Sequence, residues 1–157
     1  MIKILFICHG NICRSPMAEF IFKDMVAKKG MAENFEISSK ATSSEEIYHG
    51  VGNPVYPLAR EELAKHGISC AGKWAEQMKS DDYDKYDYII GMDSMNVRNM
   101  ERITGKKAGG KMRMLLEFAG ENRDVRDPWY TGQFDETYRD ISVGCTAFLE
   151  YLEKTEK

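Results

Sequence analysis

The chain has 157 residues, a length that fits one domain, so residues 1–157 are expected to fold as a single unit. Its 30% charged residues, 43% hydrophobic residues and formal net charge of −3 are typical of a globular protein and do not indicate a nucleic-acid partner. With no export signal and no run of about 18 apolar residues, we expect a monomeric cytoplasmic protein that makes no membrane contact and keeps its cysteines reduced.

The first third of the chain predicts a strand, a helix and a second strand. Residues 2–7 form an apolar run that favours a strand. After Pro16 the apolar residues recur at helical spacing, and Gly30 is a stop signal. Residues 35–38 alternate as in a short second strand.

A second helix is predicted to begin at residues 53–54, because Asn-Pro resembles an N-cap followed by the first helical position. In this helix Leu58 and Leu63 are expected to face the core. Gly67 should end it directly after His66.

The second half of the chain continues the alternation of strands and helices. Residues 88–90 predict a buried third strand, and Asp93 is placed to cap the helix that follows. Residues 111–115 are a candidate fourth strand. The last helix has the clearest apolar stripe, which indicates core packing: Tyr138, Ile141, Cys145, Phe148, Leu149 and Leu152.

This alternation predicts an α/β protein, a single-domain, doubly wound, four-stranded parallel sheet with helices on both faces. In such sheets the ligand site lies beyond the carboxyl ends of the strands, where the strand order reverses. The loop after the first strand falls at that place.

This loop, residues 8–14, has the layout of a phosphate loop. Cys8 follows the apolar strand, Arg14 closes the segment, and Ser-Pro then opens the helix. Successive backbone N–H groups can turn inward around a tetrahedral anion, and the helix N-terminus adds positive charge. The Arg14 side chain would complete the site with a bidentate fork, and the same field favours the thiolate form of Cys8. A cysteine at the end of a buried strand is otherwise a small inert hydrophobe.

Nine consecutive residues resemble the signature Cys-x-Gly-Asn-x-Cys-Arg-Ser-Pro of the low-molecular-weight protein tyrosine phosphatases: Cys8, His9, Gly10, Asn11, Ile12, Cys13, Arg14, Ser15 and Pro16. Residues 127–130, Asp-Pro-Trp-Tyr, are similar to the acid loop of the same family. The resemblance covers the whole chain. It implies a single phosphatase domain that hydrolyses phosphotyrosine proteins or small aryl phosphates, with residues 9–13 and Ser15 forming the phosphate site.

The resemblance also assigns the catalytic roles. Cys8 would attack phosphorus and form a phosphocysteine, while Arg14 and the loop amides hold the phosphoryl oxygens. Asp127 would protonate the leaving oxygen and then activate water. From the local sequence alone, Asp127 could equally be a turn residue, since Asp-Pro opens many turns. No cofactor or metal is expected, because zinc-type cysteine spacing is absent and the three histidines are scattered.

Several further residues are expected to support the loop. Ser15 is an obvious N-cap for the first helix, and its hydroxyl could also donate to the Cys8 sulfur. Asn11 suits a left-handed backbone conformation. The family resemblance implies that its side chain is held by a serine and a histidine, which Ser39 and His66 match.

The walls of a phosphotyrosine pocket must be apolar, and Tyr48, Trp129 and Tyr130 are the candidates for stacking on the ring. Residues 47–54 form a longer loop than is usual in the family. Trp129 stands where the family often has tyrosine, and His9 where a small or apolar residue is common.

Cys13 is predicted to act as a resolving thiol for an oxidised Cys8, since the resemblance implies that the two side chains meet. The alternative is that Cys13 only packs under the loop.

Three other functions compete with the tyrosine phosphatase. In a related protein-arginine phosphatase, the residue before the second loop cysteine tends to be threonine, whereas Ile12 resembles the tyrosine branch. A thioredoxin-coupled arsenate reductase needs two more cysteines, but only Cys70 lies between the first helix and the third strand. A non-catalytic phosphopeptide-binding module would not need both Cys8 and Asp127.

Overall fold

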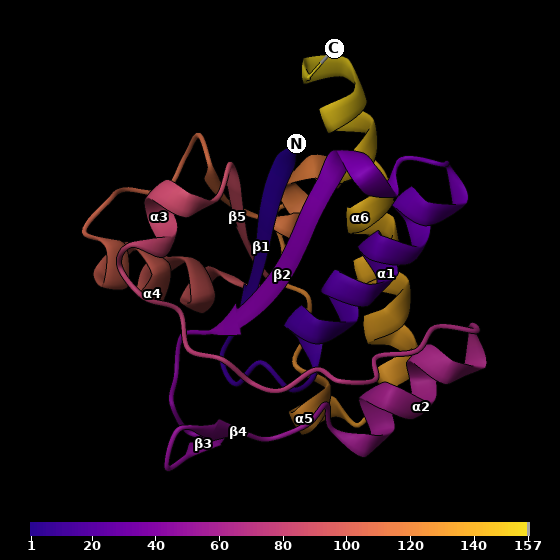
Figure 1. Ribbon diagram of the computed structural model, residues 1–157, viewed down its shortest axis with the longest axis vertical. Coiled ribbons are helices and arrows are strands. Elements are labelled where there is room, and N and C mark those ends of the chain that lie inside the picture. The colour runs from indigo at the N-terminus through magenta and orange to yellow at the C-terminus, as the bar shows by residue number, and fades with distance from the viewer. Residues whose placement is uncertain (157) are drawn as a thin grey trace.

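The computed structural model describes residues 1–156 and shows an α/β fold whose central sheet has the order β2-β1-β5-β6, with all four strands parallel (Figure 1). The elements in chain order are β1 (Ile2–Cys8), α1 (Arg14–Lys28), η1 (Ala32–Asn34), β2 (Phe35–Ala41), β3 (Ile47–Tyr48), β4 (Val51–Gly52), α2 (Pro57–Lys65), α3 (Asp82–Lys85), β5 (Tyr88–Gly91), α4 (Ser94–Thr104), β6 (Met112–Met114), η2 (Leu115–Ala119), α5 (Pro128–Thr131) and α6 (Phe134–Thr155). This arrangement confirms the predicted fold class.

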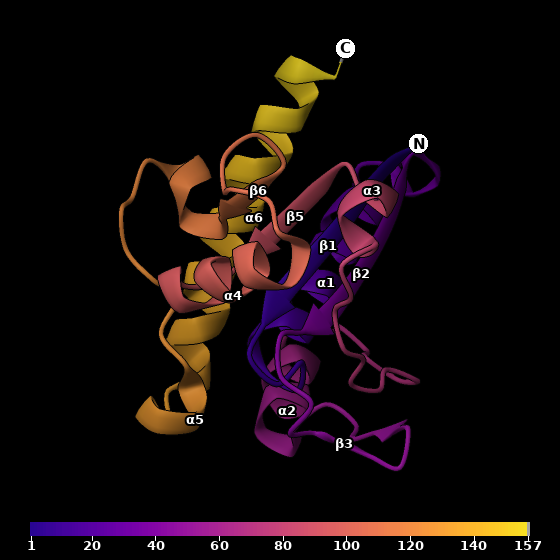
Figure 2. The ribbon, with the colours of Figure 1, turned by 90° about the vertical axis from the view of Figure 1, so that its left-hand side faces the viewer.

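The sheet is buried on both faces, as the continuous apolar run of β1 requires. On one face Phe6 lies in a core built from α1, α2 and α6, where the rings of Phe22 and Phe148 are 5.5 Å apart. On the other face Leu5 and Ile7 join a smaller cluster with α4. Figures 1 and 2 show α1 and α6 on one side of the sheet and α3 and α4 on the other.

The topology places the end of β1 at the switch point of the sheet. The chain leaves β1 for β2 on one side and later returns to β5 on the other side of β1. Cys8 is the last residue of β1, so it lies between the carboxyl ends of the two neighbouring strands. The hairpin β3–β4 and helix α5 lie at the same end of the sheet (Figure 1).

Helix α2 begins three residues later than the Asn-Pro signal predicted. Pro54 forms an isolated bridge with Trp74, so it belongs to an extended segment, and Pro57 takes the first helical position instead. With this start, Leu63 is fully buried but Leu58 is 46% exposed, which corrects the expectation that Leu58 faces the core. The other predicted strands and helices are present, with small differences at their ends.

The long segment 47–54 contains an unpredicted two-stranded hairpin, β3–β4, in which Tyr48 pairs with Val51. Its tip has two residues with positive φ, His49 at 50° and Gly50 at 79°, as a tight two-residue hairpin turn requires. Gly52 lies against the Ala75 backbone, where a Cβ would be 1.9 Å from the carbonyl oxygen. This contact fixes the base of the hairpin.

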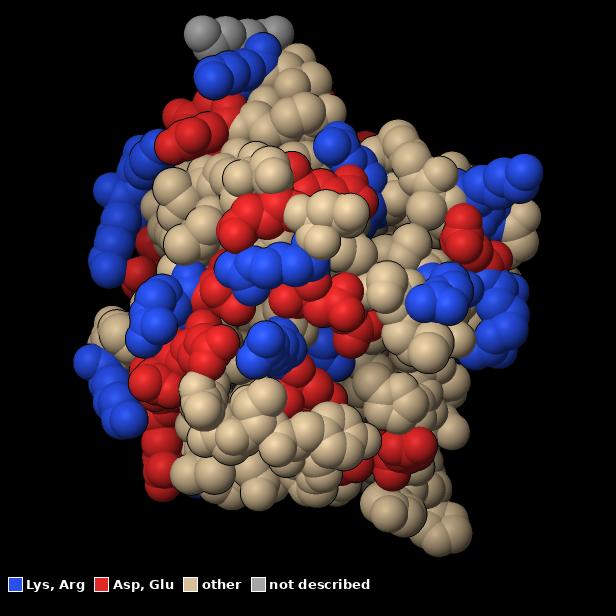
Figure 3. All heavy atoms as spheres, turned by 180° about the vertical axis from the view of Figure 1, so that it is seen from behind, with Lys and Arg blue, Asp and Glu red and all other residues tan. Residues whose placement is uncertain are grey.

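The surface charge and the helix composition bear on which nucleic-acid or membrane partners the fold could take. Acidic and basic side chains are interspersed on the face shown in Figure 3, and neither sign forms a continuous patch there. No helix within residues 1–156 is both long and apolar enough to cross a membrane.

Candidate active site

The loop between β1 and α1 wraps around the sulfur of Cys8. Cys8, Asn11 and Arg14 are all at most 3% exposed, and Asn11 has a φ of 61° that turns its backbone inward. The Asn11 N–H donates to the Cys8 Sγ at 3.3 Å. The Ser15 Oγ lies 3.0 Å from the same sulfur. These donors stabilise a negative charge on the sulfur.

The position of Ser15 differs from the predicted one. Helix α1 begins at Arg14, its N-cap is Cys13, and no side chain caps it, so Ser15 lies inside the first turn. Its oxygen accepts from the Asn11 Nδ2 at 2.8 Å. Because Asn11 already supplies a donor to this oxygen, the hydroxyl proton of Ser15 is free to point at the Cys8 sulfur.

Asn11 is held on three sides. Its Nδ2 donates to Ser15 and, at 2.9 Å, to the Ser39 Oγ, while its Oδ1 accepts from the Glu76 N–H at 3.0 Å. Both N–H groups and the oxygen of the side-chain amide are therefore hydrogen-bonded, which fixes the left-handed conformation at the centre of the loop. The expected contact of Ser39 with Asn11 is present.

The expected contact of His66 with Asn11 is absent. The His66 Nε2 lies 3.1 Å from Glu62 Oε2, and its ring stacks on Tyr138 at 3.7 Å. His66 follows the end of α2, which packs against α6, and it therefore faces Tyr138 of α6 instead of the loop.

A buried ion pair supports Ser39 instead. The Ser39 Oγ donates to Glu19 Oε1 at 2.6 Å, and Lys73 Nζ lies 3.6 Å from the same carboxylate and donates to the Ser39 carbonyl at 2.7 Å. Glu19 is 5% exposed and is also paired with Lys23. Burial lowers the pKa of Lys73.

The guanidinium of Arg14 is fixed through its two terminal nitrogens. One terminal nitrogen donates to Asp93 Oδ2 at 2.7 Å and to the Val125 carbonyl at 3.0 Å, and the other lies 3.5 Å from Asp127 Oδ2. Burial opposes the charge of the guanidinium, but Cys8 and Asp93 outweigh this effect and raise the pKa of Arg14. A fixed cation therefore stands beside the sulfur.

Asp93 has two roles at the end of β5. Its Oδ1 accepts from the Asn96 N–H at 2.7 Å and caps α4, which confirms the predicted cap. Its other oxygen holds Arg14, a contact that the sequence analysis missed. The signal available was its place two residues after β5, a strand that neighbours β1.

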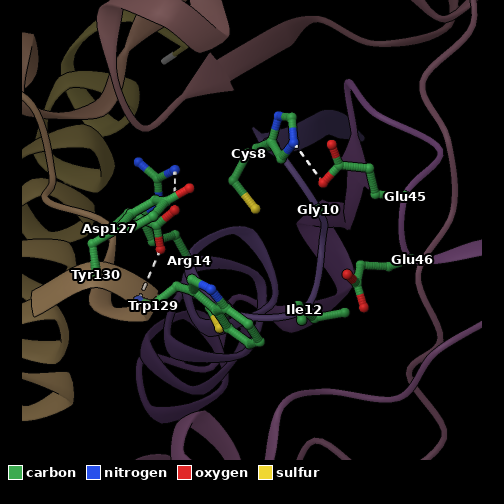
Figure 4. A pocket seen from close by; sticks show the side chains of 11 residues that line it. Cys8, Gly10, Ile12, Arg14, Glu45, Glu46, Asp127, Trp129 and Tyr130 are labelled. Atoms are coloured by element: carbon green, nitrogen blue, oxygen red, sulfur yellow. Dashed lines mark hydrogen bonds and ion pairs between the residues drawn. The ribbon is translucent and has the colours of Figure 1, made fainter. Parts of the chain in front are cut away.

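Asp127 is the N-cap of the short helix α5. Its Oδ1 accepts from the Trp129 N–H at 3.0 Å, which leaves Oδ2 directed toward Arg14 (Figure 4). The carboxyl side chain is 28% exposed, so it is open to both the cavity and solvent. Asp127 therefore caps the turn and also occupies a position suited to acid catalysis.

These groups surround a cavity of about 220 Å³. Figure 4 shows Asp127 and Tyr130 on one side of the Cys8 sulfur and two acidic residues, Glu45 and Glu46, on the other. The cavity is lined by Cys8, His9, Gly10, Ile12, Cys13, Arg14, Glu45, Glu46, Asp127, Trp129 and Tyr130.

The three predicted aromatic wall residues have different positions. Trp129 and Tyr130 line the cavity, and the Trp129 ring is supported by Tyr56 at 4.9 Å. Tyr48 does not line it, because it lies on the projecting hairpin and is 65% exposed. The expectation that Tyr48 forms a wall of the pocket is thus corrected.

Cys13 is buried beneath the loop and also lines the cavity. Burial, followed by the nearby Cys8, raises the pKa of the Cys13 thiol well above its usual range. All four cysteines are free thiols. Cys13 therefore remains protonated near neutral pH.

Comparison with known proteins identifies the family. The model for "Low molecular weight phosphotyrosine protein phosphatase" matches residues 3–157. The chain belongs to this family. It is 39% identical to the low molecular weight protein-tyrosine-phosphatase YfkJ of Bacillus subtilis over 159 residues, which covers 100% of this chain and 99% of the relative.

Family members of known structure share the fold. The crystal structure of Bacillus subtilis YfkJ superposes with a TM-score of 0.93 at 38% identity and covers 100% of this chain and 98% of that one. The Drosophila arginine phosphatase DARP superposes with a TM-score of 0.84 at 27% identity, covering 96% and 97% of the two chains.

Proposed function

We propose that this chain is a protein-tyrosine phosphatase that hydrolyses phosphotyrosine and other aryl phosphate monoesters through a phosphocysteine. One observation supports this most strongly. The buried Cys8 sulfur accepts the Asn11 N–H at 3.3 Å at the floor of a cavity that Arg14 and Asp127 also line. A thiol so placed is suited to be a nucleophile, and the two other groups supply charge neutralisation and a proton.

In the first step the phosphoryl oxygens bind the loop N–H groups and the Arg14 guanidinium. The Cys8 thiolate attacks phosphorus in line with the ester oxygen, so that a P–S bond forms while the P–O bond to the phenol breaks. Asp127 transfers its proton to the departing oxygen. This leaves a phosphocysteine, a free phenol and an Asp127 carboxylate.

In the second step the same carboxylate takes a proton from water as the water oxygen attacks phosphorus. The P–S bond breaks and inorganic phosphate leaves. The Ser15 hydroxyl, 3.0 Å from the sulfur, stabilises the thiolate that departs. The fixed donors around Cys8 thus serve both steps, first for the nucleophile and then for the leaving group.

The substrate class follows from the cavity walls. Ile12 and the Trp129 ring give it apolar sides, which favour an aromatic ring over the polar chain of phosphoarginine. Protein-arginine phosphatase remains the second candidate, since one structural neighbour, DARP, is named an arginine phosphatase. Turnover of matched phosphotyrosine, phosphoserine and phosphoarginine peptides would separate these candidates.

Action as a cytoplasmic monomer without a metal remains part of this proposal. The four free, buried cysteines are compatible with a reducing compartment. Sedimentation of the purified chain tests the monomer. Turnover after treatment with a strong chelator tests metal independence, and loss of activity that zinc or magnesium restores would overturn it.

The decisive test is Cys8→Ser. A serine hydroxyl is a far weaker nucleophile than a cysteine sulfur, so turnover of p-nitrophenyl phosphate and of a phosphotyrosine peptide should fall below about 1% of wild type. Calorimetry with inorganic phosphate should still show binding, because the loop donors remain. The control is Cys70→Ala, since Cys70 is buried away from the cavity. Residual turnover above this level would remove Cys8 from the nucleophilic role.

A further inference from the structure

The wall of the cavity opposite Asp127 is acidic. Glu45 and Glu46 follow β2 and precede the hairpin, and both line the cavity beside His9, Gly10 and Ile12 (Figure 4). An acidic wall is unexpected in a site for a phosphate ester, because a carboxylate repels the dianion that must bind. The two residues differ in their hydrogen-bond partners.

Glu45 has a partner, since its Oε2 lies 3.0 Å from the His9 Nε2. Glu46 has a neutral partner only: its Oε1 accepts from the Asn53 Nδ2 at 3.0 Å, and no ion pair to Glu46 occurs within residues 1–156. Its carbonyl also accepts from the Asn53 N–H at 2.8 Å. Glu46 is therefore held in place by Asn53, and none of the cations among residues 1–156 pairs with it.

Glu46 also lies close to the phosphate loop. A Cβ on Gly10 would be 3.3 Å from the Glu46 Cγ, so the side chain packs directly over this loop position. The half-buried side chain and its bond to Asn53 keep the charge at the entrance of the cavity. A larger residue at position 10 would push the Glu46 side chain away by a few tenths of an ångström.

The charges inside the site do not balance the Glu46 carboxylate. A phosphate dianion and the Cys8 thiolate face a single guanidinium, and Arg14 already pairs with Asp93 and lies near Asp127. A substrate that brings its own cation to the entrance would remove this repulsion and gain an attraction. Charges placed in this way select among partners more than they raise affinity.

We propose that Glu46, held by Asn53, forms a subsite for a lysine or arginine next to the phosphotyrosine in a protein substrate. This inference rests on the proposed function and names the substrate class within it. Glu46 is then a specificity residue outside the chemical step. Since the attraction acts between partly exposed charges, it should weaken as salt is added.

The experiment compares three phosphotyrosine peptides that differ only in flanking lysine, alanine or glutamate. Wild type should have a kcat/KM about five- to tenfold higher for the lysine peptide than for the glutamate peptide at low salt, because the ratio combines attraction to the lysine with repulsion of the glutamate, each of the size of a partly exposed ion pair. In Glu46→Gln, which keeps an oxygen for Asn53, the ratio should fall to about twofold or less. Because both peptides are measured on one enzyme, changes in catalysis cancel in the ratio.

Glu45→Gln is the matched control. Its charge is one residue away and already faces His9, so the ratio should stay near that of wild type. A wild-type ratio within twofold would overturn the inference, as would a ratio that Glu46→Gln leaves unchanged or that Glu45→Gln lowers equally. If Glu46→Gln lowered only turnover of a phosphoarginine peptide, the carboxylate would act inside the cavity, and the flanking subsite would be wrong.

The proposed function fails by a different result. If wild type turns over none of the three peptides, the chain is not a phosphotyrosine phosphatase. If it turns over all three equally, the function stands and only the Glu46 subsite is lost.

Discussion

The two halves of the candidate site, the phosphate loop at residues 8–14 and the acid loop at residues 127–130, are built in opposite ways. In the phosphate loop, Asn11 is 1% exposed and its side chain makes hydrogen bonds to three residues. In the acid loop, Trp129 is 56% and Tyr130 is 84% exposed, and Asp127 is oriented mainly by the Trp129 N–H. In the proposed mechanism, the loop that holds the phosphoryl oxygens is embedded in the core. The carboxylate that exchanges protons with water stands at the edge of the cavity.

This difference implies two kinds of response to substitution. A change in the phosphate loop alters the geometry of every substrate's phosphoryl group, so its effect should be large for all substrates. A change at the acid loop should depend on how much help the leaving group needs.

The largest effect is expected for Arg14→Lys. A lysine carries the charge but cannot reproduce the planar fork that reaches Asp93, the Val125 carbonyl and a phosphoryl oxygen together. We expect kcat/KM for p-nitrophenyl phosphate to fall by about 10³-fold. The control is Arg123→Lys, because Arg123 forms its pairs with Asp140 and Glu121 on the surface. Retention of a tenth of the activity would contradict a role for Arg14 in the transition state.

Asp127→Asn should have a smaller effect that depends on the substrate. Asparagine can still cap α5 through its oxygen, but it cannot donate and recover a proton. We expect about a 100-fold loss for phenyl phosphates with poor leaving groups and a smaller loss for activated ones. The measurement is kcat/KM across a series of leaving groups, with Asp124→Asn as the nearby control. Equal losses along the series would count against the acid role.

The same contrast explains what could be predicted from the sequence. The loop motif at 8–16 and the acid motif at 127–130 are contiguous, and their chemistry follows from neighbours in the chain. The pairing of Arg14 with Asp93 joins residues 79 positions apart, and that of Asn11 with Glu76 joins residues 65 apart. Such contacts depend on strand order and helix placement, which local patterns do not specify.

The errors have the same cause. Two prolines, Pro54 and Pro57, can each open a helix, and only the bridge of Pro54 to Trp74 decides between them. The placement of α2 then turns His66 toward Tyr138 and leaves Lys73 and Glu19 to support Ser39. Lys73 lies in a loop, and nothing in the local sequence indicates that it supports Ser39. Glu19 gives a weak signal, because it lies one helical turn after Ser15 and therefore on the same side of α1.

Ser39→Ala tests how far the rigidity of the phosphate loop depends on that buried support. The change removes an acceptor from Asn11 and the hydroxyl donor from Glu19, so buried polar groups lose partners. We expect the free energy of unfolding to fall by about 1–3 kcal/mol. We also expect kcat/KM to fall by about tenfold, with weaker inhibition by inorganic phosphate.

Ser38→Ala, on the opposite face of β2, is the control for this prediction. Lower stability without a change in phosphate inhibition would mean that Ser39 supports the fold but does not position the loop. Both quantities come from denaturant titration and steady-state inhibition of the same samples.

The smallest effect concerns Cys13 and appears only under oxidation. The Cys8 thiolate attacks one oxygen of peroxide, which gives a sulfenic acid and releases hydroxide, and a second thiolate can then displace hydroxide from the sulfenic acid to form a disulfide. The Cys13 thiol lines the same cavity, but burial raises its pKa, so little of it is the reactive thiolate at neutral pH. Capture of the sulfenic acid should therefore be slow and should accelerate as pH rises, because the thiolate fraction grows.

We therefore expect peroxide to inactivate wild type, reductant to restore most activity at a low dose, and phosphate to protect by filling the loop. In Cys13→Ser the recovered fraction should be several-fold lower, since the sulfenic acid proceeds to irreversible products. Mass spectrometry should find Cys8 linked to Cys13 in oxidised wild type. The matched control is Cys145→Ser, because Cys145 is fully buried in α6. If Cys13→Ser recovers as fully as wild type, Cys13 only packs beneath the loop and does not protect Cys8 from irreversible oxidation.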